Sequence, residues 1–266
     1  MRILIISFIF IFCSSFIIKP TTKIVKENRK VSVFNTIETN SSIDVYIKQG
    51  DKESVIVETN EEYQKQVLIS VTDKNLIIKT KGSIINPDKF NVYIVVKELY
   101  DIKSSGSGDV ESLEKLNFQK ISLKTIGSGD IDLDLNSKNV SINIEGSGDV
   151  ELTGIINNLN IDISGSGDVE IGSINYNKVL ANNKASGDIK LLGSAKLFSL
   201  NNSGSGDIEC ASFKVKEAHV SSKGSGDIQL HVDAILNLVL SGSGDFKLIG
   251  DPATKNIKVT GSGNFY

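Results

Sequence analysis

Eight aspartates end copies of one short motif, and carboxylates repeated in this way could bind a metal ion. The motif Gly-Ser-Gly-Asp occurs seven times, an Ala-Ser-Gly-Asp variant supplies an eighth carboxylate, and a last copy ends in Asn264. The candidate ligands are Asp109, Asp130, Asp149, Asp168, Asp188, Asp207, Asp227 and Asp245. Carboxylate and turn carbonyl oxygens are hard ligands suited to Ca²⁺, which takes six to eight of them. Calcium is therefore the one cofactor that the motif suggests.

A purely structural role explains the same motif and is the interpretation that we favour. Glycine permits positive φ values and close backbone approach, and Ser and Asp side chains hydrogen-bond nearby backbone N–H groups, so the motif predicts a sharp corner. The sequence offers no facing second loop that would complete a calcium cage. Aspartates stacked about 4.8 Å apart repel by ~1 kcal/mol for each adjacent pair in a water-like dielectric. Backbone N–H donors, raised pKa values or bound cations would each relieve that repulsion.

The remaining residues with chemical potential do not suggest catalysis. His219 and His231 are flanked by apolar residues at period two, which points both side chains outward, and Cys210 occupies an inward apolar position typical of packing. The sequence contains no HExxH, G-x-S-x-G or P-loop motif. We predict a protein that is not an enzyme. The alternative is a carbohydrate-active enzyme with carboxylates gathered in a cleft, whereas these carboxylates are spread along the chain.

The motifs need a repeating element to position them. Their starting points lie 18 to 21 residues apart, which is the period of a solenoid. The residue after each Asp is apolar, as are most residues two positions further on and four positions before each motif, and this alternation predicts inward-facing strands. The intervening segments are too short and too rich in turn-forming asparagine for helices. The sequence therefore predicts an all-β fold, a parallel β-helix with coils of about 19 residues.

Two segments precede the repeat domain, which we assign to residues 104–266. Residues 24–103 contain strand-like stretches such as 43–47 and 92–96 but no motif, and we interpret them as degenerate first coils or a β cap over the N-terminal edge. Residues 1–15, or 1–19, have the charged start, apolar run and small residues of a secretory signal peptide. A membrane anchor and lipidation at Cys13 are the alternatives.

Charge and composition limit the partners. The chain has 266 residues, with 32 acidic and 29 basic side chains, and a formal net charge of −3. Basic residues are scattered among acidic ones, so we predict no nucleic-acid partner. Flat polar faces rich in Ser, Asn, Lys and Asp suit a glycan or an envelope protein. An uncapped last coil would also permit end-to-end homo-oligomers.

Several segments together resemble a known family. They are SIDVYIKQGD at 42–51, LIIKTKG at 76–82, VYIVVKEL at 92–99 and IKSSGSGDVE at 102–111. With the exported start, these segments resemble the bacterial head GIN domain, a family labelled "putative auto-transporter adhesin". The resemblance implies a right-handed β-helix and a periplasmic, outer-membrane-associated or extracellular setting, and it implies no catalytic residues. We expect an exported, non-catalytic binding or structural module at the cell envelope.

Overall fold

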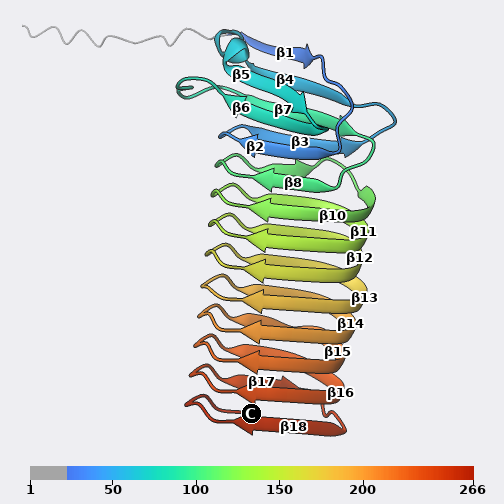
Figure 1. Cartoon of the computed structure of the whole chain (residues 1–266), viewed down its shortest axis with the longest axis vertical. Coiled ribbons are helices and arrows are strands. Elements are labelled where there is room, and N and C mark those ends of the chain that lie inside the picture. The colour runs from blue at the N-terminus through green and yellow to red at the C-terminus, as the bar shows by residue number, and fades with distance from the viewer. Residues whose placement is uncertain (1–22) are drawn as a thin grey trace, which may run out of the picture.

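The computed structural model describes residues 23–266 and has the predicted fold, a β-helix of about eight turns with coils of about 19 residues (Figure 1). Matching residues of successive coils pair in parallel, as Ile131 does with Val150 and Ile142 with Ile161. The predicted fold class is therefore confirmed. The predicted signal peptide lies outside the described residues.

Each coil of the repeat consists of two strand segments joined by two corners. The strands are β8 (Asp101–Ser104), β9 (Val110–Ser112), β10 (Leu116–Thr125), β11 (Ile131–Ile144), β12 (Val150–Ile163), β13 (Val169–Asn183), β14 (Ile189–Asn202), β15 (Ile208–Ser222), β16 (Ile228–Leu240), β17 (Phe246–Ile249) and β18 (Thr254–Val259). Segments that follow a motif form the first sheet, and segments that precede the next motif form the second sheet. The motif itself forms the GSGD corner. The second corner lies at the opposite edge, where strands β11 to β16 bend from the first sheet to the second.

The core lies between the two sheets and contains the predicted inward positions. Ile131 and Leu133 of the first sheet and Ile142 and Ile144 of the second have no exposed surface. Each such side chain stabilises the fold by about 2 kcal/mol relative to an exposed position. Because equivalent residues stack from coil to coil, one continuous apolar core runs along the whole β-helix.

The N-terminal region contains one further coil and an antiparallel cap. Its elements are β1 (Ile24–Arg29), β2 (Thr36–Asn40), β3 (Asp44–Gln49), β4 (Ser54–Asn60), the 3₁₀ helix η1 (Glu61–Gln66), β5 (Val67–Thr72), β6 (Asn75–Thr80) and β7 (Phe90–Val96). Strands β2 and β3 pair in parallel with β8 and β9, and β6 and β7 stack in parallel on their other side. Strands β1, β4 and β5 then pair antiparallel and cover this end of the β-helix (Figure 1).

The motif glycines allow the corners of successive coils to approach closely. A Cβ atom added to Gly127 would lie 1.8 Å from the carbonyl oxygen of Gly106, and one added to Gly148 would lie 2.1 Å from that of Gly129. The glycines of the described chain with positive φ are Gly82, Gly154, Gly193 and Gly250, none of which belongs to a motif. The expectation of positive φ in the motif is therefore wrong. Close backbone approach is the reason for glycine there.

Ala185 replaces the first glycine of one motif, and the corner differs there. From the second copy on, the other motif serines donate their N–H to the carbonyl at the first motif position of the preceding coil. Within residues 23–266, no such bond joins Ser186 to Gly165. The buried Asn183 hydrogen-bonds this corner: its Oδ1 accepts the N–H of Ala185 at 3.1 Å, and its Nδ2 donates to the carbonyl of Gly187 at 2.7 Å.

Candidate functional site

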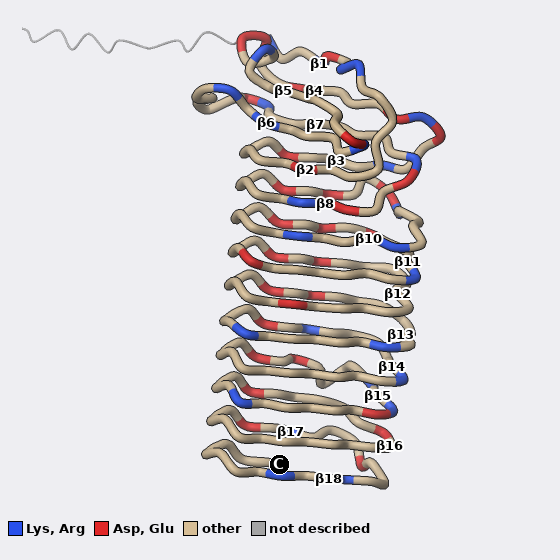
Figure 2. Tube along the Cα trace, in the orientation of Figure 1, with Lys and Arg blue, Asp and Glu red and all other residues tan. Residues whose placement is uncertain are grey.

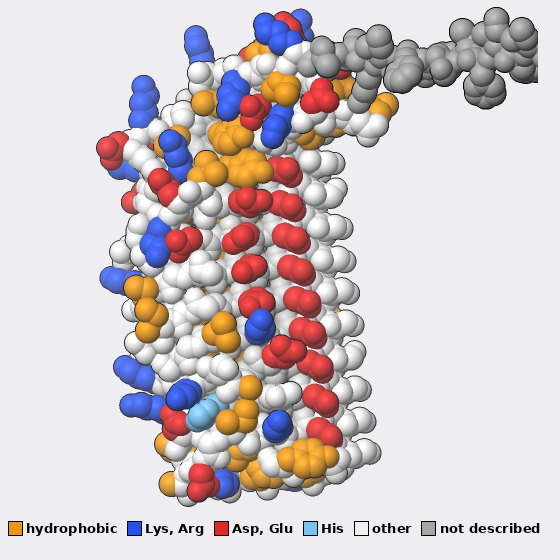
Figure 3. Space-filling view, turned by 180° about the vertical axis from the view of Figure 1, so that it is seen from behind, with side chains coloured by type: hydrophobic (Ala, Val, Ile, Leu, Met, Phe, Trp, Pro, Cys, Tyr) orange, Lys and Arg blue, Asp and Glu red, His pale blue; other side chains and the backbone are white. Residues whose placement is uncertain are grey.

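The eight candidate aspartates form one hydrogen-bonded column, which we call the aspartate ladder. The Oδ1 atom of Asp109 accepts the backbone N–H of Asp130 at 2.9 Å, and that of Asp149 accepts the N–H of Asp168 at 2.7 Å. The same bond recurs through Asp245, whose Oδ1 accepts the N–H of Asn264 at 2.8 Å. A backbone donor therefore relieves repulsion at every carboxylate. The ladder is one of the two red columns in Figure 3.

The ladder begins earlier than the motif does. Asp44 accepts the N–H of Asp109 at 3.2 Å, although Ser41 and Ile43 stand where the later coils have glycine. The sequence Asp44-Val45, an aspartate followed by an inward valine, is the signal that could have identified this coil. At the other end Asn264 also donates its Nδ2 to Asp245 at 3.1 Å, so a neutral side chain ends the column.

The electrostatic environment changes along the ladder. Burial, with the charges of Asp188 and Asp149, raises the pKa of Asp168 above its ordinary value, although the N–H of Asp188 opposes this. The N–H of Asn264 lowers the pKa of Asp245. Members of one column with the same backbone geometry therefore differ in how readily they take up a proton.

A second acidic column lies beside the ladder on the outer face of the first sheet. It contains Glu111, Asp132, Glu151 and Glu170, which pair in register from coil to coil (Figure 3). Burial and the charges of Asp132 and of the ladder raise the pKa of Glu111. Lys190 follows in the same column, and its Nζ lies 2.7 Å from Glu170.

These carboxylates do not form a preformed calcium cage. One oxygen of each ladder carboxylate already accepts a backbone N–H group. Across residues 23–266, no group of three or more His, Cys, Asp or Glu side chains is placed to hold a metal ion. Since Ca²⁺ needs six to eight oxygens around one point, the residues present do not fit the ion in this arrangement.

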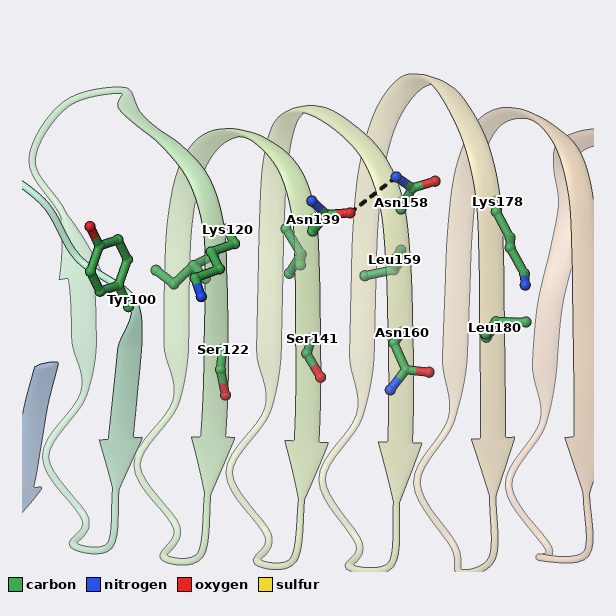
Figure 4. A pocket seen from close by; sticks show the side chains of 12 residues that line it. Tyr100, Lys120, Ser122, Asn139, Ser141, Asn158, Leu159, Asn160, Lys178 and Leu180 are labelled. Atoms are coloured by element: carbon green, nitrogen blue, oxygen red, sulfur yellow. Dashed lines mark hydrogen bonds between the residues drawn. The ribbon is translucent and has the colours of Figure 1, made fainter.

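A groove crosses the opposite side of the molecule, on the outer face of the second sheet. Its first part has a volume of about 450 Å³ and lies over β10 to β13 (Figure 4). Its second part, of about 580 Å³, lies over β14 to β18 and is shifted by one column of outward residues. Ser199 continues the column of Ser122, which also lines the first part, and Asn201 continues the column of Lys124, which does not. We call the two parts the amide groove. Its polar lining residues are Tyr100, Lys120, Ser122, Asn139, Ser141, Asn158, Asn160, Lys178, Ser199, Asn201, His219, Ser221, Asn237, Asn256 and Lys258.

Hydrogen bonds between coils order the amides of this groove. Asn158 donates its Nδ2 to the Oδ1 of Asn139 at 3.1 Å (Figure 4). In the second part, Asn256 donates its Nδ2 to the Oδ1 of Asn237 at 2.8 Å. Each amide in such a pair keeps a donor or acceptor for a ligand. A chain that lies along the β-helix axis would meet a similar set of polar groups about every 4.8 Å. The sequence predicts polar faces but does not locate this groove, although asparagines 19 residues apart are a signal for it.

The model of one protein family matches most of this chain. The model of the family described as "Putative auto-transporter adhesin, head GIN domain" matches residues 33–189 and 163–252. The chain belongs to the head GIN domain family. The expected resemblance is thereby confirmed.

Solved structures share the fold of this head GIN domain chain. A "putative adhesin" from Parabacteroides distasonis matches with a TM-score of 0.71 and 22% identity, covering 92% of this chain and 97% of its own. A "putative lipid binding protein" from the same species matches with a TM-score of 0.65 and 22% identity, covering 92% and 98%. A "putative adhesin" from Parabacteroides merdae has a TM-score of 0.57 and 21% identity, covering 92% and 97%. A comparison with curated proteins finds no match.

The residues considered for catalysis are separated in this head GIN domain chain. His219 is exposed, and its Nε2 lies 2.8 Å from Glu217. His231 is half-buried on the first sheet, 3.1 Å from Asp233. Cys210 is fully buried in the core, and burial raises the pKa of its thiol to about 12. The inward position of Cys210 and the outward position of His219 agree with the sequence analysis.

Within the part of the chain that the structure describes, no helix has the length and apolar character needed to cross a membrane.

Proposed function

We propose that this protein is an exported, non-catalytic, adhesin-like module that binds a glycan chain along the amide groove. The observation that carries the proposal is the groove itself. Its two parts lie over β10 to β13 and over β14 to β18, and the lining combines amide and hydroxyl groups with an aromatic ring, that of Tyr100, which is 40% exposed. Glycans present many hydroxyl groups that both donate and accept hydrogen bonds, and side-chain amides do the same.

The shape of the site favours a long ligand over a compact one. The lining repeats by coil, so a polymer can bind through several weak, equivalent contacts. A buried catalytic pocket would instead concentrate its polar groups at one point. The acidic columns lie on the other sheet, away from the groove, which argues against a glycan-cleaving carboxylate pair in it.

Family membership supports the adhesin-like part of the proposal. An adhesin must meet its partner outside the cytoplasm, and an exported chain at the cell envelope satisfies this requirement. The charged and apolar start of the sequence provides a means of export. One structural relative is described as lipid binding, so lipid is the competing ligand class to test.

A blocked groove provides the test. Ser141 is exposed in the middle of the first part of the groove, and Ser141→Trp would fill it, whereas Gln229→Trp puts the same side chain on the outer face of the first sheet. We expect wild type and Gln229→Trp to bind envelope polysaccharides on a glycan array, and Ser141→Trp to lose at least about tenfold in affinity. Unchanged melting temperatures would show that both variants fold.

Two outcomes would overturn the proposal. One is equal glycan binding by wild type and Ser141→Trp, which would place the ligand elsewhere. The other is binding to phospholipid vesicles with no glycan binding, which would favour the lipid class.

A further inference from the structure

The lysines of the amide groove narrow the ligand class beyond the proposed function, on which this inference rests. Lys120 and Lys178 lie on the same outward column of the second sheet, joined through Asn139 and Asn158 in the two intervening coils. Three coil spacings separate them, which is about 14 Å. Both side chains line the first part of the groove (Figure 4).

Neither lysine has a carboxylate partner among residues 23–266, although other lysines of the protein do. Lys124, two outward columns away from Lys120, lies 2.7 Å from Glu145, and Lys190 on the first sheet lies 2.7 Å from Glu170. The Nζ of Lys120 instead lies over the ring of Tyr100, 5.5 Å from its centre. This contact holds one ammonium group at the end of the groove without neutralising its charge.

Carboxylates border the groove but do not line it. Asp162 accepts hydrogen bonds from Asn160 and Asn182, both at 2.9 Å, and Glu217 is hydrogen-bonded to His219. The charged side chains that line the two parts are the lysines Lys120, Lys178 and Lys258. The outer face of the first sheet, by contrast, carries two acidic columns that would repel an anionic ligand (Figure 2, Figure 3).

We infer that the glycan is anionic, a polysaccharide whose carboxylate or sulfate groups meet Lys120 and Lys178 while its hydroxyl groups contact the amides between them. Two cations about 14 Å apart on a rigid sheet select a ligand with charges at a matching repeat. The acidic first sheet keeps such a polymer on one side of the molecule. The amides then distinguish a polyhydroxylated chain from other polyanions.

The test compares charged and neutral forms of one polymer. We would measure binding of the protein to a polyuronate, to its carboxyl-reduced neutral form, to a sulfated polysaccharide and to inorganic polyphosphate, each at low and high salt. The test variant is the double change Lys120→Gln and Lys178→Gln. The matched control is Lys247→Gln, which removes an exposed lysine from the first sheet.

We expect the polyuronate or the sulfated chain to bind with an affinity that falls as salt rises, and the double variant to lose about tenfold, because each exposed ion pair is worth up to roughly fivefold. The Lys247→Gln control should bind like wild type. The anionic polymer that binds, the polyuronate or the sulfated chain, identifies the acid group of the ligand.

Other outcomes separate this inference from the proposed function. If the neutral polymer binds as well as the charged one, or the double variant binds like wild type while Ser141→Trp does not, the groove binds glycans but the anionic inference is wrong. Equal binding to polyphosphate would also overturn it, because charge alone would then suffice. If the wild-type protein binds none of the glycans tested, both the proposed function and the anionic inference are wrong.

Discussion

The two corners of each coil follow different rules. At the GSGD corner, a Cβ atom added to a motif glycine would lie about 2 Å from a backbone carbonyl oxygen of the preceding coil, and a hydrogen bond joins each aspartate to the next. At the second corner the pairing register shifts in several coils, for example between Gly154 and Asn158 and between Gly172 and Asn175. One corner therefore fixes the stacking of the coils, and the other absorbs differences in coil length.

Inserting one residue should reveal this difference most strongly. A serine inserted between Ser147 and Gly148 would displace the glycine and the aspartate from their partners in both neighbouring coils. We expect a loss of about 3 kcal/mol or more in the free energy of unfolding, or failure to fold. A serine inserted at the second corner, between the exposed Asn157 and the half-buried Asn158, should cost less than about 1 kcal/mol. Urea unfolding of the two variants measures the effect, and equal losses would contradict the assignment.

A single methyl group provides a finer comparison. A Cβ atom on Gly148 would lie 2.1 Å from a backbone oxygen, whereas one on Gly172 would meet nothing within 4 Å, and neither residue has positive φ. We expect Gly148→Ala to destabilise the protein by about 2–3 kcal/mol because backbone must move. Gly172→Ala should be neutral or stabilise by about 0.5 kcal/mol, since it restricts the unfolded chain. Thermal melts of both variants test this, and a harmless Gly148→Ala would remove close approach as the reason for glycine.

The sequence was informative where one rule repeats and less so where each coil differs. Inward positions such as Val150 and Ile161 were predictable because alternation and the 19-residue period agree. Asp44 was missed because 65 residues, instead of about 19, separate it from Asp109, its partner in the ladder. In addition, the two glycine positions before it hold Ser41 and Ile43.

The amide groove could not be located in this way. Asn139 and Asn158 meet only because the second corner keeps them in register after the chain has bent. Between β12 and β13 the pairing register shifts after Gly154, and pairing resumes with Asn158 opposite Lys178. Outward positions also carry no apolar signal, so periodicity says little about which of them share a surface.

Removing one aspartate side chain from the ladder should have an intermediate effect on the free energy of unfolding. Asp168→Ala leaves the N–H of Asp188 without the acceptor that now lies 2.7 Å away, and we expect a loss of about 1 kcal/mol. Asp168→Asn keeps an acceptor oxygen and removes one charge, and its Nδ2 can donate to the preceding aspartate as that of Asn264 does. We therefore expect Asn to be within about 0.5 kcal/mol of wild type. Chemical denaturation of the pair distinguishes the two roles, and equal destabilisation would show that the charge itself is needed.

The smallest expected effect is on how stability depends on pH. It differs between the middle of the ladder and its end. The pKa of Asp168 is raised in the folded chain, chiefly by burial, so its contribution to stability is complete below the unfolded pKa of about 3.9 and is lost as pH rises through the folded value. The pKa of Asp245 is lowered, chiefly by the N–H of Asn264, so its contribution is present above the unfolded pKa and is lost as pH falls through the folded value.

Melting temperatures of wild type, Asp168→Asn and Asp245→Asn between pH 3 and pH 7 should therefore diverge in opposite directions. Asp168→Asn should gain on wild type as pH rises, because the wild type must then hold a carboxylate whose pKa the structure raises, beside the charges of Asp188 and Asp149. Asp245→Asn should lose relative to wild type over the same interval, because it gives up a carboxylate that the end of the ladder stabilises. Titration of the two carboxyl groups by NMR gives the order directly, and a higher pKa at Asp245 than at Asp168 would show that backbone donors stabilise the middle of the ladder at least as well as its end.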